Sequence, residues 1–81
     1  MVVRVLLFGP YADAVGAASV SVTLAGEPTC AAVREGLARG HPALVGMMTG
    51  ARFAVNGRFA DERGVVREAD EVALIGLVSG G

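Results

Sequence analysis

The end of the sequence carries the group with the clearest reactive chemistry. An apolar run from Val72 to Val78 is followed by Ser79, Gly80 and Gly81, where the sequence stops. Because glycine has no side chain, such an end can enter a channel that any Cβ would block, and it can adopt backbone angles closed to other residues. We therefore expect the terminal carboxylate of Gly81 to be the working group, with Gly80 as slack for threading. A small, frayed chain end is the competing interpretation.

Two other side chains have types that are often used in chemistry, Cys30 and His41. Cys30 falls at the expected start of a helix, where a thiol pKa can be lowered, but no nearby base is evident, so we interpret it as a small apolar core residue. His41 stands beside Pro42 in an expected loop, without metal-ligating neighbours. A single cysteine also excludes a disulfide within the chain and a cysteine-based zinc or iron–sulfur site. We expect no bound metal or cofactor.

Length and composition restrict the class of protein. The 81 residues form one expected domain, 1–81, and a chain of this size buries about 60% of its extended surface. A hydrophobic content of 53% is typical of a packed globule, and a net charge of −1 gives no electrostatic case for nucleic acid or a membrane surface. The apolar start is cut short by Gly9 and Pro10, which argues against a signal peptide. No run reaches the length of a membrane span, and a reducing, cytoplasmic location is the simplest expectation.

The first third of the chain predicts two strands and a short helix. Residues 2–8 are almost continuously apolar, which predicts a central strand covered on both faces. Residues 11–15 predict a short helical turn that ends at Gly16. Residues 19–24 alternate polar and apolar side chains, as a half-buried strand does. We expect this second strand to pair with the first.

One main helix is predicted over residues 30–39. Thr29 is a suitable N-cap because its hydroxyl can accept a hydrogen bond from a free amide of the first turn. Val33 and Leu37 lie one turn apart and form the apolar face. Gly40 ends the helix. The polar side is expected to consist of Arg34, Glu35 and Arg39.

The second half predicts a hairpin and a last strand. Residues 43–48 fit either a short helix or an apolar loop over the sheet. Residues 52–56 predict a strand, Asn56-Gly57 is a strong signal for a two-residue hairpin turn, and residues 58–60 predict the return strand. The last strand is expected from residue 71 to about residue 78.

This order of elements predicts an α+β fold of the ubiquitin-like β-grasp type. We expect a mixed sheet of about five strands with one main helix packed across it. The first and last strands are the most apolar, so they should lie parallel at the centre of the sheet. Residues 78–81 are expected to form a flexible C-terminal tail.

Four segments resemble one known family, the small, sulfur-carrying subunit of molybdopterin synthase. The opening Val5-Leu-Leu-Phe8 with Gly16 is similar to the start of that family, and residues 29–44 are similar to its helix and the proline after it. Ala54-Val-Asn56 matches its Val-Asn turn. The sequence Asp70-Glu-Val-Ala, about ten residues before a terminal Val-Ser-Gly-Gly, is the most specific match. The resemblance covers essentially the whole chain.

Two departures from the family pattern concern the exit of the tail and the first helix. The family often has two prolines before Val-Ser-Gly-Gly, where this chain has Gly76 and Leu77. An Arg-Glu pair often stands in the first helical turn, where this chain has Tyr11, Ala12 and Asp13. The missing prolines predict a less stiff exit for the tail.

The resemblance implies a carrier chemistry at Gly81. A separate ubiquitin-activating-like adenylyltransferase would use ATP to adenylate this carboxylate, and a sulfur donor would displace the nucleotide and leave a thiocarboxylate. The tail would then enter the large synthase subunit and give its sulfur to a cyclic pyranopterin precursor. The chain itself would be a non-catalytic subunit.

Docking on these partners is assigned to an apolar patch near the tail. The expected contact residues are Phe59, Leu77, Val78 and Ser79. For Phe59 a place in the core is the competing interpretation.

Three alternatives share the same sequence features. A thiamin-pathway sulfur carrier has the same end, although such carriers tend to lack the insertion from Gly9 to Gly16. A protein modifier would be joined through Gly81 to lysines of other proteins. The chain itself has no lysine, so lysine-linked chains of it are excluded. A β-grasp interaction domain with an inert tail is the alternative from a different class.

Overall fold

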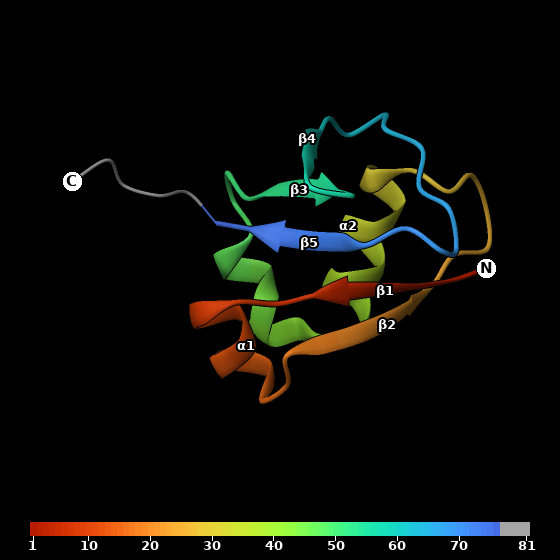
Figure 1. The fold of residues 1–81 in the computed structure, drawn as a ribbon. Helices are drawn as coiled ribbons and strands as arrows, with labels where there is room; N and C mark the ends of the chain where they lie inside the picture. Colours follow the sequence, from red (N-terminus) through yellow and green to blue (C-terminus); the bar gives the residue numbers. More distant parts are fainter. Residues whose placement is uncertain (77–81) are drawn as a thin grey trace.

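The computed structural model describes residues 1–76, which form one mixed sheet with its helices on one side (Figure 1). Five strands and two α-helices follow the predicted order, with a 3₁₀ helix, η1, in addition. The elements are β1 (Val2–Leu6), α1 (Gly9–Val15), β2 (Ser19–Thr23), α2 (Cys30–Gly40), η1 (Pro42–Met47), β3 (Arg52–Val55), β4 (Arg58–Ala60) and β5 (Val72–Ile75).

The sheet has the strand order β2-β1-β5-β3-β4. β1 and β5 are parallel neighbours, with Val5 opposite Val72 and Leu6 opposite Ala73. The pairs β1–β2, β3–β4 and β3–β5 are antiparallel. The first and last strands therefore lie parallel at the centre, which confirms the predicted ubiquitin-like β-grasp fold.

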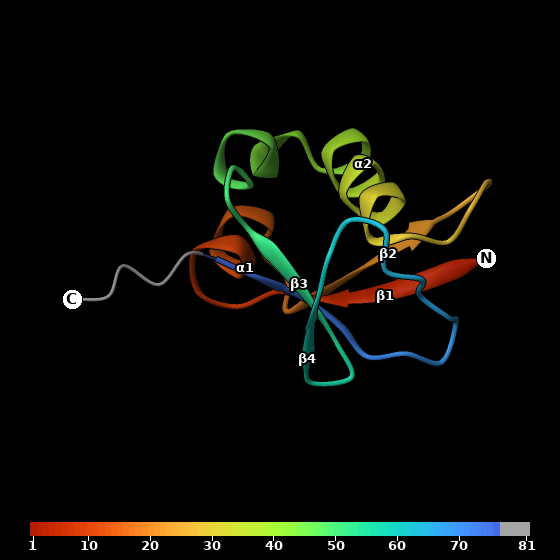
Figure 2. The ribbon, with the colours of Figure 1, turned by 90° about the horizontal axis from the view of Figure 1, so that it is seen from above.

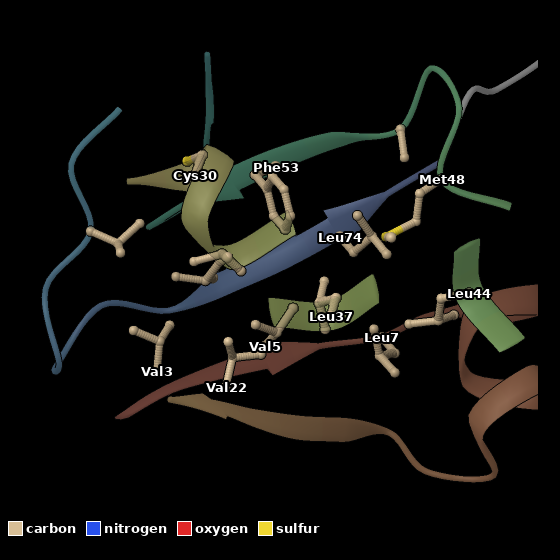
Figure 3. Packing of buried hydrophobic residues seen from close by; sticks show 14 of the residues in the cluster. Val3, Val5, Leu7, Val22, Cys30, Leu37, Leu44, Met48, Phe53 and Leu74 are labelled. Carbon is tan, nitrogen blue, oxygen red and sulfur yellow. The ribbon is translucent and has the colours of Figure 1, made fainter. Parts of the chain in front are cut away.

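The core lies between the sheet and the layer formed by α2 and η1, which Figure 2 shows above the sheet. Val33 and Leu37 of α2 are fully buried, as their spacing predicted. They pack with the inward residues of the central strands and with Leu44 of η1 (Figure 3). Of the two interpretations of residues 43–48, the short helix is thus mainly correct, and Met47 and Met48 pack against the core.

The prediction of a first strand covered on both faces is wrong. β1 ends at Leu6, and its side chains alternate between buried and exposed, with Val2 47% exposed. The helices occupy one side of the sheet, so an apolar strand here is covered on that side alone. Continuous apolar sequence is typical of strands buried on both faces; in this chain it leaves apolar residues on an uncovered face.

The start of α2 is fixed by its cap and by a distant loop. Thr29 Oγ1 accepts a hydrogen bond from the amide of Ala32 at 3.2 Å, which confirms the predicted N-cap. The amides of Cys30 and Ala31 donate to the carbonyls of Gly64 and Glu62, both at 2.9 Å. Amide groups that a helix leaves unpaired at its start are therefore satisfied by the segment that leads toward β5.

The sequence suggested that Arg34 lies on the solvated side of α2, but its side chain is partly buried against neighbouring loops. Its guanidinium donates to the carbonyls of Met48 at 3.0 Å and Ala51 at 2.6 Å, and its Nη2 lies 2.8 Å from Glu62 Oε1. It also lies 5.4 Å from the centroid of the Phe53 ring. Arg34 thus joins α2 to two loops that are distant in sequence.

The predicted turn at Asn56 and Gly57 is confirmed. Both residues have positive φ, 52° and 81°, as a type I′ turn between two strands requires. The Asn56 side chain also accepts from the amide of Glu71 and donates to Asp70 Oδ1, both at 2.9 Å. The hairpin is therefore tied to the segment that begins β5.

Candidate functional site

β5 runs toward the end of the sheet where β1 also ends, because the two strands are parallel. α1 lies at this end of the strands, and the N-terminus lies at the opposite end (Figure 1). The described part of the chain reaches Gly76, directly after β5. Five residues with predicted roles, Leu77, Val78, Ser79, Gly80 and Gly81, lie outside the described residues, as does the end of the predicted last strand.

Gly76 and Tyr11, two of the departures from the family pattern, lie against each other at this exit. A Cβ built on Gly76 would meet Tyr11 Oη at 2.8 Å and two ring carbons at 3.2 and 3.3 Å. Tyr11 is 7% exposed and donates a hydrogen bond from its hydroxyl to the Met47 carbonyl at 3.3 Å. Tyr11 therefore occupies the space that a side chain at Gly76 would need.

The uncovered face of the sheet carries a row of apolar residues that leads to the exit. Residues directly opposite each other in a sheet share a face, and the register aligns Phe59 with Ala54, Ala54 with Ala73 and Ala73 with Leu6. Residues next to them in sequence point to the helix side, and two of these, Phe53 and Leu74, are buried. Ile75, two residues beyond Ala73, continues the row toward Gly76. We call this surface the docking face. It consists of Leu6, Ala54, Phe59, Ala73 and Ile75, together with Phe8, which is described separately.

Phe59 is 58% exposed, so the interpretation of Phe59 as a core residue is wrong. β4 is a three-residue strand at the edge of the sheet, and the alternation along it places Ala60 toward the core and Phe59 on the docking face. The Arg52 guanidinium carbon lies 4.2 Å from the centroid of the Phe59 ring. A large aromatic ring that is more than half exposed therefore lies at the edge strand of this face.

Phe8 is a member of the docking face that sequence reasoning assigned to a strand alone. It follows β1 in extended backbone, φ −130° and ψ 154°, while its neighbour Leu7 is buried and Phe8 is 54% exposed. The alternation of β1 therefore continues to Phe8 and places it on the side of Leu6. Together with Ile75 and Gly76 it lines a hollow of about 470 Å³ at the exit. The sequence could have indicated this, because Phe8 is separated by an even number of residues from Leu6 and Arg4, and alternate residues of a strand point to the same face.

Cys30 lies away from the exit, in the core beneath the cap of α2. It is fully buried, and burial together with the carboxylates of Glu62 and Asp61 raises the pKa of its thiol. A raised pKa disfavours the thiolate, which is the reactive form. The prediction that Cys30 is a small core residue is thus confirmed.

The described residues contain no ready metal site and no membrane helix. Within residues 1–76, no three His, Cys, Asp or Glu side chains cluster so that they could hold a metal ion. His41 lies at the junction of α2 and η1, as the loop prediction required. No helix in this part of the chain is long and apolar enough to span a membrane.

Solved structures with the same architecture are known from archaea and bacteria. SAMP1 from Haloferax volcanii is 27% identical, with a TM-score of 0.84 and full coverage of both chains. A putative molybdopterin converting factor subunit 1 from Pyrococcus furiosus is 17% identical, with a TM-score of 0.84 over 96% of this chain and 99% of that one. In Helicobacter pylori, a complex of subunits 1 and 2 of molybdopterin-converting factor gives 20% identity, a TM-score of 0.70 and full coverage of both chains. A comparison with curated proteins gave no match.

The strand order and the match to SAMP1 define a ubiquitin-like β-grasp fold. The sequence profile of the ThiS family matches residues 5–81. The chain therefore belongs to the ThiS family of ubiquitin-like sulfur carriers.

Proposed function

We propose that this chain is the sulfur-carrying small subunit of a molybdopterin synthase, with Gly81 as its reactive residue. The observation that carries the proposal is the docking face, which leads along the sheet to the point where β5 delivers the tail. A carrier needs a surface that partners can hold while its end enters their active site. Phe59 and Phe8 supply the exposed aromatic area, and Leu77, Val78 and Ser79 continue it in the proposal.

The chemistry proposed at Gly81 has two steps. A carboxylate oxygen of Gly81 attacks the α-phosphorus of ATP in an adenylyltransferase, and pyrophosphate leaves. Hydrosulfide supplied by a sulfur donor then attacks the acyl carbon, AMP leaves with the bonding electrons, the S–H proton is lost to base, and a thiocarboxylate remains. The sulfur anion of the thiocarboxylate is the nucleophile that attacks the cyclic pyranopterin precursor in the large subunit.

The described residues support a carrier role more than a catalytic one. The thiol of Cys30 is buried with a raised pKa, and the hollow at the exit is lined mostly by apolar side chains, among them Phe8, Met47 and Ile75. In the proposal, catalytic side chains and the substrate pocket belong to the partners. ATP and the reducing conditions that the thiocarboxylate needs fit a cytoplasmic location.

The pairing with a large subunit is supported by an analogous assembly. The Helicobacter pylori structure is a complex of subunits 1 and 2 of molybdopterin-converting factor, and its fold matches this chain over its full length. The Gly9–Val15 helix α1 is in keeping with this assignment, because the thiamin-pathway carriers tend to lack the corresponding insertion.

A protein modifier is the second candidate function. Structures of small archaeal modifier protein 1 from Haloferax volcanii are 27% and 25% identical to this chain, with TM-scores of 0.84 and 0.85. A modifier would use the same adenylate at Gly81 but transfer the acyl group to a lysine amine of another protein. The two functions share activation and differ in the final nucleophile.

Intact mass spectrometry tests the proposal. The chain is incubated with the adenylyltransferase, ATP and a sulfur donor, and a mass gain equal to the exchange of one oxygen for sulfur, mapped to Gly81, is the expected result. A variant with one alanine added after Gly81 is the matched control and should stay unchanged. An unchanged mass of the native chain, under conditions that convert a known carrier, would refute the carrier function. Mass ladders on other proteins would select the modifier.

A further inference from the structure

Arg52 places a cation inside the docking face, beside the exit of the tail. It is the first residue of β3, it lies opposite Ile75 of β5, and its side chain is exposed. Its guanidinium lies over the Phe59 ring at 4.2 Å from the centroid. Stacking on an aromatic face restrains a side chain that would otherwise be very mobile.

The hydrogen-bonding capacity of Arg52 is unused within the described chain. A guanidinium has five N–H donors in one plane, and stacking on Phe59 occupies its face and leaves its edge open. In residues 1–76, no hydrogen bond to another residue uses these donors, and the side-chain ion pair found there joins Arg34 to Glu62 instead. Arg52 therefore presents a positioned fork of donors to solvent.

The other arginine on the same face has a different environment. Arg4 donates to Ser19 Oγ at 3.2 Å and lines a hollow with Glu68, Asp70 and Glu71, near the start of β5. This face of the sheet thus has an arginine among carboxylates at one end and the unpaired Arg52 at the other, near Gly76. The end with Arg52 is therefore the one at which a cation has no carboxylate beside it among the described residues.

We propose that Arg52, stacked on Phe59, binds a carboxylate of the partner that receives the tail, an Asp or Glu flanked by apolar residues. The inference rests on the proposed function and specifies the chemistry of its docking surface. A planar guanidinium matches a carboxylate in a two-point geometry, which fixes orientation as well as charge. The pair orients the partner on the sheet, so that the tail points toward the partner's active site.

The experiment measures binding of the full-length chain to the large synthase subunit from the same genome, by calorimetry at about 50 mM and about 500 mM salt. Arg52→Gln should weaken binding about tenfold at low salt, and the difference should shrink at high salt. Arg52→Lys keeps the charge without the planar fork of donors, and its affinity for the large subunit at low salt should be about threefold lower than that of the native chain.

Arg58→Gln is the matched control. Arg58 is also an exposed arginine of this hairpin, but it lies opposite Val55 and so has the parity of the helix side of the sheet. The affinity of the Arg58→Gln variant for the large subunit should stay within about twofold of that of the native chain. Equal melting temperatures for all four proteins show that the fold is unchanged.

The outcomes separate this inference from the proposed function. If the native chain binds and Arg52→Gln binds equally well, or if Arg58→Gln loses as much affinity, the inference is refuted while the proposed function stands. If the native chain does not bind the large subunit at all, both the proposed pairing and this inference are refuted. A loss confined to Arg52 and sensitive to salt supports the inference.

Discussion

The close contact between Tyr11 and Gly76 leads us to predict that a side chain at position 76 lowers the free energy of unfolding of the domain. In Gly76→Ala, the new Cβ would lie 2.8 Å from Tyr11 Oη and 3.2 Å from a ring carbon. Tyr11 is 7% exposed and is held by the hydrogen bond to Met47, so its ring has little room to retreat. Overpacking of this kind costs about 1–3 kcal/mol.

An opposing effect acts through the unfolded chain. Gly76 has no positive φ, so alanine fits its backbone conformation, and Gly→Ala then stabilises by about 0.4–1 kcal/mol because it restricts the unfolded state. The net expectation for Gly76→Ala is a loss of about 1 kcal/mol, or roughly 4–8 °C in Tm for a domain of this size.

The double-mutant cycle with Tyr11→Leu tests this reasoning. Leucine at position 11 removes the hydroxyl and the ring atoms that the Cβ would meet, so Gly76→Ala should become neutral or stabilising by about 0.5 kcal/mol in that background. Urea unfolding of the four proteins gives the coupling free energy. Equal effects of Gly76→Ala in both backgrounds would refute the steric argument, and a stabilised Gly76→Ala single mutant would do so more directly.

Three further predictions concern other contacts. Arg34→Met should lower the free energy of unfolding by about 2–3 kcal/mol because two backbone carbonyls lose a charged donor, whereas Glu62→Gln should cost less than about 1 kcal/mol; comparable losses in urea unfolding would contradict this ranking. Hydrogen bonds from Asn56 and the Arg67 amide lower the pKa of Asp70 below 3.8, so its stabilising contribution is present above that pH and is lost as the pH falls through the lowered value. Asp70→Asn should therefore show a weaker loss of stability between pH 6 and pH 2, and parallel acid profiles would argue against it. Leu77→Asp should weaken adenylation and large-subunit binding about tenfold or more without lowering Tm, and unchanged activity in both assays would remove Leu77 from the docking surface.

Local patterns in the sequence were sufficient for the elements and for the topology. Thr29 as a cap, the spacing of Val33 and Leu37, and the turn at Asn56-Gly57 depend on interactions within a few residues, so each could be predicted from sequence alone. The apolar character of the first and last strands indicated the centre of the sheet. The excess of apolar residues in β1, however, was interpreted as burial on both faces.

The candidate site depended on contacts between distant segments. Phe59 and Phe8 are exposed because a single helical layer covers one side of the sheet, and no local pattern reveals which side stays open. Tyr11 and Gly76 are separated by most of the chain, so their contact became visible when α1 and the end of β5 were placed together. The same holds for Arg34, which a helical pattern assigns to solvent.

The sequence by itself determined the order of elements, the β-grasp topology and the expectation of a reactive Gly-Gly end, because these follow from hydrophobic periodicity, turn residues and the composition of the tail. The tertiary structure decided where β5 ends and which surface lies beside that point. Strand register places Phe59, Ala54, Ala73 and Leu6 on one face. The turn at Asn56-Gly57 fixes the pairing of Phe59 with Ala54 locally, whereas the pairings of Ala54 with Ala73 and of Ala73 with Leu6 join strands that are distant in sequence. This surface therefore exists as a unit only in the folded chain.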